Sequence, residues 1–155
     1  MTQNHRSPNQ IIWPNSIKDG PIPTTIQKFF QSADDATHEG SIAFSKCFSQ
    51  TGELLARGYT CKGHEELIKF RQGAWDVITY RKHEPRKVYT SASDEKDLVV
   101  LGNVMFRHKN GQRVTQEFVG NFIFDEVRDE EALIQSYQAW LDSKPLADLM
   151  AGGSS

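Results

Sequence analysis

The sequence predicts an α+β fold in which helices cover one side of a curved, mostly antiparallel sheet. Two observations predict it. Helix-like patterns fill the first half of the chain, whereas long strand-like runs joined by short turns fill the second half. In addition, apolar runs over 97–108 and 113–124 flank Asn110-Gly111, and this dipeptide between apolar runs is the strongest short-range signal for a β-hairpin.

The hairpin predicts a register and two faces. A two-residue turn at Asn110-Gly111 places Asn103 opposite Phe118. One face would then carry Val99, Leu101, Asn103, Met105, Phe118, Gly120, Phe122 and Phe124. The other face would also be apolar, so we expect both sides of the sheet to be covered, one by helices and the other by a second sheet or a second subunit.

Periodicity and turn residues predict the remaining elements. In chain order they are a helix from Thr24 or Thr25 to about 36, a helix over 40–48, a strand over 53–61, the longest helix over 64–81, a strand over 83–91, a last strand over 132–141 and a helix over 145–150. The long helix begins with Glu65 and Glu66 and ends at Arg81-Lys82, which is the charge order that the helix dipole favours.

The chain is expected to have three parts. Four of the six prolines lie in residues 1–23 among Asn, Gln, Ser and Gly, a composition that cannot build a core. We therefore expect a flexible arm over 1–23, one domain over 24–151 and a disordered tail over 152–155. Within the arm, the apolar Ile11, Ile12 and Trp13 are an exception, because they can dock on the body or on a partner chain.

Charge and cysteine content exclude several classes of function. The 18 basic and 20 acidic residues give a net charge of −2 without a basic stripe, so no nucleic acid is expected as a partner. No apolar run approaches the length of a membrane span, and no signal peptide is recognised. Cys47 and Cys61 lack CxxC spacing, which favours a reducing, cytoplasmic setting. Since neither metal-ligand spacing nor a phosphate loop occurs, we expect no metal and no cofactor.

Several short motifs, in their order and spacing, carry a resemblance to a known superfamily. They are Lys62-Gly63-His64-Glu65-Glu66-Leu67-Ile68-Lys69-Phe70-Arg71, Trp75, Arg81-Lys82-His83, Phe124-Asp125-Glu126 and Tyr137-Gln138-Ala139-Trp140-Leu141-Asp142. With them, residues 24–146 resemble the nuclear transport factor 2-like superfamily. Within it they are most similar to the SnoaL-like proteins common in fungi, which are related to scytalone dehydratase and to ketosteroid isomerase.

The resemblance implies a cone-shaped α+β barrel. A strongly bent sheet wraps a pocket, the N-terminal helices pack on its concave side, and the back of the sheet commonly forms a homodimer. Function varies among such proteins, because the superfamily includes isomerases, dehydratases and polyketide cyclases as well as proteins that only bind partners.

Three residues are candidates for catalysis through this resemblance. His83 falls where scytalone dehydratase has a pocket histidine, and an imidazole can take and return a proton near neutral pH. Asn103 lies near a second histidine of that enzyme, so the sequence departs from its pattern there, and a structural hydrogen bond competes with a ligand contact. Asp35 lies near an acid of that enzyme, and its alternatives in the same loop are Asp34, His38 and Glu39.

The candidates for substrate binding are residues of the expected inner face and pocket, namely Tyr59, Trp75, Leu101, Met105, Phe118, Phe122 and Tyr137. The tyrosines can donate hydrogen bonds, and the aromatic rings can equally be core. Gly120 stands where ketosteroid isomerases carry an aspartate. Its missing side chain either leaves room for a bulky group or marks a kink in the sheet.

Together these residues and the resemblance predict a cofactor-independent lyase, isomerase or cyclase. Its substrate would be a small apolar secondary metabolite of polyketide or terpenoid type, on which it transfers a proton. The alternative is a non-catalytic dimeric module that binds an apolar ligand or a peptide. A hollow with His83 on its wall would favour the enzyme, whereas a solid core filled by Phe118, Phe122 and Trp75 would favour the module.

Overall fold

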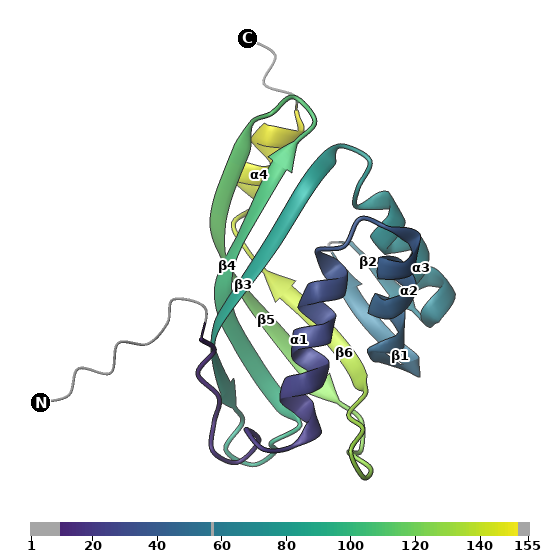
Figure 1. The fold of residues 1–155 in the computed structure, drawn as a ribbon, viewed down its shortest axis with the longest axis vertical. Helices are drawn as coiled ribbons and strands as arrows, with labels where there is room; N and C mark the ends of the chain where they lie inside the picture. Colours follow the sequence, from purple (N-terminus) through teal and green to yellow (C-terminus); the bar gives the residue numbers. More distant parts are fainter. Residues whose placement is uncertain (1–9, 57, 152–155) are drawn as a thin grey trace, which may run out of the picture.

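The computed structural model describes residues 10–56 and 58–151 (Figure 1). Its elements are α1 (Pro21–Ala33), α2 (His38–Lys46), β1 (Phe48–Ala56), β2 (Tyr59–Lys62), α3 (His64–Gly73), β3 (Ile78–Thr90), β4 (Asp97–His108), β5 (Arg113–Phe124), β6 (Ile134–Trp140) and α4 (Ser143–Met150). Within these residues the strands form one six-stranded sheet in the order β2-β1-β6-β5-β4-β3. Neighbouring strands are antiparallel except β1 and β6, which confirms the predicted α+β fold with a mostly antiparallel sheet.

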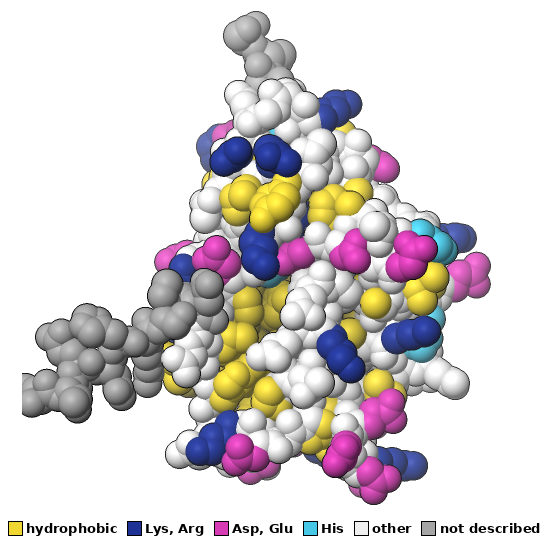
Figure 2. All heavy atoms as spheres, viewed as in Figure 1, with side chains coloured by type: hydrophobic (Ala, Val, Ile, Leu, Met, Phe, Trp, Pro, Cys, Tyr) yellow, Lys and Arg dark blue, Asp and Glu magenta, His cyan; other side chains and the backbone are white. Residues whose placement is uncertain are grey.

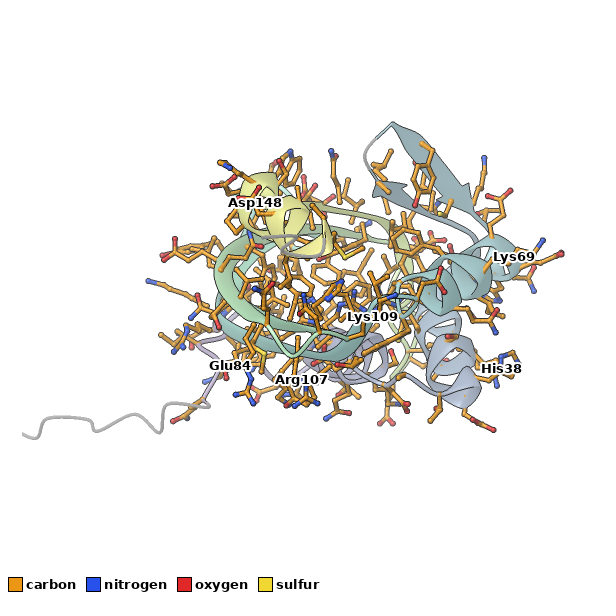
Figure 3. All side chains as sticks on the ribbon, turned by 90° about the horizontal axis from the view of Figure 1, so that it is seen from above. His38, Lys69, Glu84, Arg107, Lys109 and Asp148 are labelled. Carbon is orange, nitrogen blue, oxygen red and sulfur yellow. The ribbon has the colours of Figure 1, made fainter. Side chains whose placement is uncertain are left out.

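The sheet is strongly curved, and its concave side is covered by helices. Seen from above, the strands curl round an interior filled with side chains, with α4 on one side and α2 and α3 on another (Figure 3). Helix α1 crosses in front of the sheet in Figure 1. Its inner face places Phe29 4.9 Å from Phe122 and 4.5 Å from Tyr137, measured between ring centres.

The first helix begins earlier than predicted, at Pro21. Proline suits the first turn of a helix, because its fixed φ is helical and the missing N–H would have had no partner there. The expected cap Thr25 instead lies inside α1 and donates its hydroxyl to the carbonyl of Ala132 at 2.7 Å. This bond ties α1 to the segment that leads into β6.

The longest predicted helix is too long. Helix α3 ends at Gly73, and β3 begins at Ile78, so Arg81 and His83 both lie in a strand. The residues from Val77 to Tyr80 are β-branched or aromatic, and these types favour strands over helices. Arg81, expected as a helix-end charge, is therefore carried into the interior and is only 8% exposed.

The other predicted elements hold with shifts at their ends. The strand expected over 53–61 is two strands, since Gly58, with φ of 77°, makes a turn between β1 and β2. Thr51 and Gly52 lie within β1. The last strand and the terminal helix are confirmed as β6 and α4.

The turn between β4 and β5 has three residues instead of two. The N–H of Gly111 donates to the carbonyl of His108 at 2.9 Å, and the N–H of His108 donates to the carbonyl of Gln112 at 2.8 Å. In this turn only Gly111 has positive φ, 89°, whereas a two-residue type I′ turn needs it at both central residues. Arg107 therefore pairs with Arg113, and the predicted register is wrong by one residue.

This shift corrects the two predicted faces, because a one-residue slip moves a whole strand to the other side of the sheet. Gly102, not Asn103, is opposite Phe118, and Val100, not Leu101, is opposite Gly120. The buried inner face takes the even-numbered residues of both strands. The outer face carries Leu101, Asn103 and Met105 and is more polar than predicted, with Asp97, Arg107, Arg113, Thr115, Glu117 and Asn121 as further members.

Residues 10–20, part of the predicted arm, pack on the body of the domain. Ile12 bridges β3 in parallel, since its N–H donates to the carbonyl of Arg86 at 2.9 Å and its carbonyl accepts from Val88 at 3.0 Å. Ile17 is buried. The remainder of the predicted arm, residues 1–9, and the predicted tail over 152–155 lie outside the described residues. Among the described helices, none combines the length and the hydropathy needed to span a membrane.

Candidate active site

His83 and Asp34 form a hydrogen-bonded pair between β3 and the end of α1. The Nδ1 atom of His83 lies 2.6 Å from Oδ1 of Asp34, and the backbone N–H of His83 donates to Oδ2 at 2.8 Å. The two side chains are 16% and 11% exposed. An ionised carboxylate can only accept hydrogen bonds, so in the neutral ring Nδ1 carries the proton and Nε2 keeps its lone pair.

Asp34 can reach His83 because of its place in the chain. It directly follows the last residue of α1, with φ of −88° and ψ of −5°, so its side chain leaves the helix end toward β3. The predicted acid, Asp35, points elsewhere: its Oδ1 accepts from the N–H and the hydroxyl of Thr37 at 2.9 and 2.7 Å, on the surface. Of the four acidic and histidine candidates in this loop, the structure brings Asp34 to His83.

The other two candidates of the loop lie on the exterior of α2. His38 points outward in Figure 3, where its Nδ1 lies 2.6 Å from Nε2 of Gln72. Glu39 is exposed in the first turn of α2.

The surroundings of His83 favour its neutral form. Burial lowers the pKa of the imidazole below its ordinary value, and the positive charges of Arg81 and Arg71 lower it further, although the hydrogen bond with Asp34 opposes both. The ring packs against Phe30 and Phe118, with centres 5.1 and 5.5 Å away. A neutral imidazole with an oriented ring and a free Nε2 is suited to accept a proton.

An apolar cavity of about 590 Å³ reaches His83. It lies between α1, α3, β1 and β6, and its lining is Phe29, Ala33, Phe44, Leu54, Leu55, Ala56, Gly58, Phe70, Arg71, Ala74, Arg81, His83, Phe106, Tyr137, Gln138, Ala139, Trp140, Leu141 and Leu146. Most of these side chains are apolar, and a few polar groups converge among them, which is the usual make-up of a small-molecule site. A hollow of similar volume at the other end of α1 does not reach His83.

A second, smaller hollow also reaches the pair. It has about 400 Å³ and is lined by Phe30, Asp34 and His83 together with Ile11 and Pro85 among others. On this side of the molecule hydrophobic side chains gather between the N-terminal segment and α1, and charged side chains of both signs surround them (Figure 2). His83 therefore lines both hollows, and Asp34 lines the smaller one.

Tyr137 is the predicted binding residue that does line the cavity. Burial raises the pKa of its hydroxyl, so the phenol stays protonated and can donate a hydrogen bond. Its ring fits because Gly120, on the neighbouring strand, has no side chain: a Cβ there would lie 2.9 Å from Oη of Tyr137. Of the two interpretations of Gly120, room for a bulky group is the one that the packing supports, and Tyr137 is that group.

The other predicted binding residues lie elsewhere. Leu101 and Met105 are on the outer face of β4, and Tyr59 is 54% exposed on β2. Phe118 and Phe122 are buried on the inner face as core under the cavity, and Trp75 lies 4.8 Å from the guanidinium of Arg81.

The predicted catalytic Asn103 does not face the cavity. It is on the outer face, and with its amide oxygen turned toward Arg86 it accepts from Nε and Nη2 of that residue, both at 3.0 Å. The structural hydrogen bond is thus the alternative that the geometry supports. Its assignment to the inner face was wrong because it depended on the incorrect hairpin register.

Sequence reasoning missed two buried arginines in the cavity wall, Arg71 of α3 and Arg81 of β3, which are 7% and 8% exposed. The predicted long helix runs to residue 81, so it places Arg81 at a helix end. Arg71 lies four residues after Leu67, on the same face of the helix, and this spacing is the signal in the sequence that it is buried.

The described part of the chain contains no group of three or more His, Cys, Asp or Glu side chains placed to hold a metal ion. Cys47 and Cys61 are both buried and not bonded to each other. Burial raises the pKa of the Cys47 thiol to about 11, so it is protonated at neutral pH.

Comparison with known proteins gives matches among solved structures. No protein-family model matches the chain, and no curated protein matches its sequence. An NTF2-like protein of unknown function from Burkholderia pseudomallei K96243 superposes with a TM-score of 0.67 at 17% identity, over 84% of this chain and 97% of the other. TerC, co-crystallised with polyporic acid, superposes with a TM-score of 0.69 at 18% identity, over 86% of this chain and 100% of the other.

A third match is a putative SnoaL-like polyketide cyclase from Jannaschia sp. CCS1, with a TM-score of 0.65 at 13% identity over 84% of this chain and 91% of the other. At such identities the similarity concerns the fold. The chain therefore has the nuclear transport factor 2-like fold, that of the SnoaL-like and ketosteroid isomerase-like proteins, as its motifs indicate.

Proposed function

We propose that the protein is a cofactor-independent lyase, isomerase or cyclase that moves a proton on a small, largely apolar metabolite of polyketide or terpenoid type. One observation carries the proposal: His83, oriented by Asp34 at 2.6 Å, lies on the wall of a cavity of about 590 Å³. An acid that orients an imidazole through Nδ1 is also found in Ser-His-Asp triads, where the histidine acts as a general base.

The chemistry follows from the free nitrogen of the imidazole. Nε2 of His83 takes a proton from a carbon next to a carbonyl group, and the electron pair of that C–H bond becomes the C=C bond of an enolate. The negative charge passes to the carbonyl oxygen. The resulting imidazolium is stabilised by Asp34 and returns its proton to the same carbon, to another carbon or to a leaving group. Tyr137, protonated and in the same cavity, can donate a hydrogen bond to the oxygen.

The substrate class is supported by the cavity and by the comparisons. A largely apolar lining with few polar groups fits a cyclic or aromatic molecule of modest size. TerC was crystallised with polyporic acid, and another similar structure is described as a polyketide cyclase. The role in secondary metabolism is part of the proposal and rests on these proteins, which share the fold.

The test is exchange of a carbon-bound proton with solvent. The purified protein is incubated in D₂O with apolar cyclic ketones such as 1-tetralone and 2-tetralone, and deuterium uptake next to the carbonyl is followed by NMR. We expect His83→Ala to lose about 10²- to 10⁴-fold in rate, the usual contribution of one positioned acid–base group. His38→Ala removes an exposed histidine on α2 and serves as the control. Equal rates for wild type and His83→Ala would contradict the proposal.

The alternative, a non-catalytic binding module, is favoured by one observation. Phe118 and Phe122 are buried in a continuous aromatic core, as they would be in a packed scaffold. The cavity that contains His83 lies beside this core, which supports the enzyme over the module.

We also propose that the protein acts as a homodimer through the outer face of the sheet, in the cytoplasm. Leu101, Val119 and Trp140 follow one another across three strands on that face, and Trp140 is 50% exposed. Apolar side chains that adjoin one another on a surface mark association sites. The unpaired thiols of Cys47 and Cys61 support a reducing compartment.

A further inference from the structure

Two buried positive charges in the cavity wall have no acidic partner in an ion pair among the described residues. Arg71 and Arg81 are 7% and 8% exposed, and neither forms an ion pair with a described residue. The described lining of the cavity contains no aspartate or glutamate. Charged groups are buried rarely unless they are paired, because removing them from water is costly.

Each guanidinium uses only part of its hydrogen-bonding capacity. Nη2 of Arg71 donates to the carbonyl of Ala33, the last residue of α1, at 2.5 Å. Nη2 of Arg81 donates to the carbonyl of Ala74, just beyond α3, at 3.2 Å. These bonds place both cations at helix C-termini, where positive charge is favoured. Nε of Arg71 and Nη1 of Arg81 are buried and have no partner among the described residues.

Aromatic rings lie close to both guanidinium groups. The centre of the Arg71 guanidinium lies 5.1 Å from the ring of Phe44, and that of Arg81 lies 4.8 Å from Trp75 and 5.4 Å from Phe106. An aromatic ring attracts a guanidinium without using its N–H groups, so these groups stay available for the oxygens of an anion. The two groups are thus held in place before any ligand enters.

The charge balance around the cavity indicates the sign of that ligand. The charged and titratable groups that act on one another there are Arg71, Arg81, His83, Asp34 and Tyr137. Burial and mutual repulsion lower the pKa of Arg71 to about 9, and burial lowers that of Arg81 to about 10, so both are charged at neutral pH. His83 and Tyr137 are neutral, and both oxygens of Asp34 are bonded to His83. The two arginines against the single carboxylate of Asp34 give the site an excess of positive charge, and this excess favours an anionic ligand.

We propose that Arg71 and Arg81 form an anion-binding subsite and that the substrate of His83 carries an oxygen-centred negative charge, as a carboxylate or an acidic enol, which this subsite binds. The proposal specifies the substrate class of the proposed function and rests on it for the reaction, but not for the binding. A ligand so placed brings its apolar body against Phe29, Phe44 and Phe70 and its reacting carbon toward His83.

The experiment compares two probes of nearly equal shape, 2-naphthoate and 2-naphthamide, by isothermal titration calorimetry at pH 7.5. We expect wild type to bind the anion at least about tenfold more tightly than the amide, which corresponds to about 1.4 kcal/mol. Arg81→Met and Arg71→Met should abolish this preference. Lys69→Met removes an exposed cation from α3, with a side chain 76% exposed, and should leave the preference unchanged. Equal binding of the two probes, or no binding of either, in wild type would overturn the proposal.

Two further measurements keep the outcomes distinct. Because Arg71 also binds the end of α1, its loss can unfold the protein, and thermal melting identifies that case. The comparison of probes in wild type needs no variant and decides the proposal even then. His83→Ala should retain the preference for naphthoate. A retained preference together with unchanged proton exchange in His83→Ala would leave the anion subsite standing and refute the proposed function.

Discussion

Tyr137 occupies the space that a side chain on Gly120 would fill. An added Cβ at Gly120 would lie 2.9 Å from Oη and 3.0 Å from Cε2 of Tyr137. The phenol is also enclosed by Phe29 and Phe122, with ring centres 4.5 and 4.6 Å away, so it cannot move aside freely. The glycine thereby sets the position of a polar group in the cavity wall.

Gly120→Ala should therefore destabilise the protein by roughly 1–3 kcal/mol, the usual cost of forcing an extra methyl group into a packed core. Gly73→Ala is the matched control, because nothing lies within 4 Å of the added methyl group at the end of α3. Urea denaturation of both variants measures the free energies of unfolding. If Gly120→Ala were as stable as Gly73→Ala, the packing of Tyr137 against Gly120 would be wrong.

Asp34→Asn should lose activity, whereas Asp35→Asn should not. Asp34 orients His83, and an amide in its place can hold the wrong tautomer of the ring, so we expect a loss of roughly 10²- to 10⁴-fold in proton exchange. Asp35 binds Thr37 on the surface, and its variant should keep the wild-type rate. The D₂O assay with tetralones measures both variants. Loss of activity in Asp35→Asn alone would restore the assignment made from sequence.

His83 gives the protein a defined dependence on pH. The pKa of its imidazole is lowered on folding from an ordinary 6.5, so the folded protein binds this proton less readily than the unfolded chain. The stability due to neutral His83 is present above pH 6.5 and is lost as the pH falls through the lowered pKa. Urea denaturation at pH 7.5 and 5.5 should show that His83→Gln loses less stability on acidification than wild type. An equal loss in both proteins would count against a buried neutral imidazole.

Arg81→Met should raise the pKa of His83, since the positive charge of Arg81 lowers it. Lys82→Met is the control: it removes a charge from the residue adjacent to His83, but that side chain is exposed to water, which screens its charge. NMR titration of the imidazole measures both shifts. The pH at which proton exchange declines should move upward in Arg81→Met and stay in place in Lys82→Met. A larger shift in Lys82→Met would contradict the buried position of Arg81.

Leu101→Arg should convert the proposed homodimer into a monomer. Leu101 lies beside Val119 on the outer face, so an arginine there would put a charge into the apolar contact. Thr115→Arg, farther along the same face, is the control. Light scattering on the variants and on wild type gives the masses. A monomeric wild type would refute the dimer.

The sequence predicts the class of fold well because that class depends on periodicity. Alternating apolar residues and the Asn-Gly turn locate the β4–β5 hairpin, and the motif through His83 indicates the fold that the solved structures share. The register depends on whether Asn110 takes positive φ, a local choice that this sequence leaves open. That single choice decides whether Leu101 and Asn103 face the cavity or the outside.

The site was predicted in part, and its errors have a common cause. His83 is located by motif, whereas its partner depends on where α1 ends. Moving the helix end by a few residues exchanges Asp34 for Asp35, because successive side chains on a helix point about 100° apart. Arg81 was expected on the surface but lies in the cavity wall for a similar reason: α3 ends at Gly73, before the predicted end of the helix. The direction of a side chain near the end of a helix or strand is therefore hard to predict from sequence, because the end itself varies by one or two residues.

The three-residue turn at Lys109-Asn110-Gly111 has a consequence for related chains and for engineering. Surface loops ordinarily tolerate insertions and deletions at little cost. Here the loss of one residue would shift the register of β5 by one residue. Glu117 and Asn121 would then face inward, and Phe118 and Phe122 would face outward. The length of this exposed loop is therefore constrained more strictly than its composition, and substitutions are safer there than deletions.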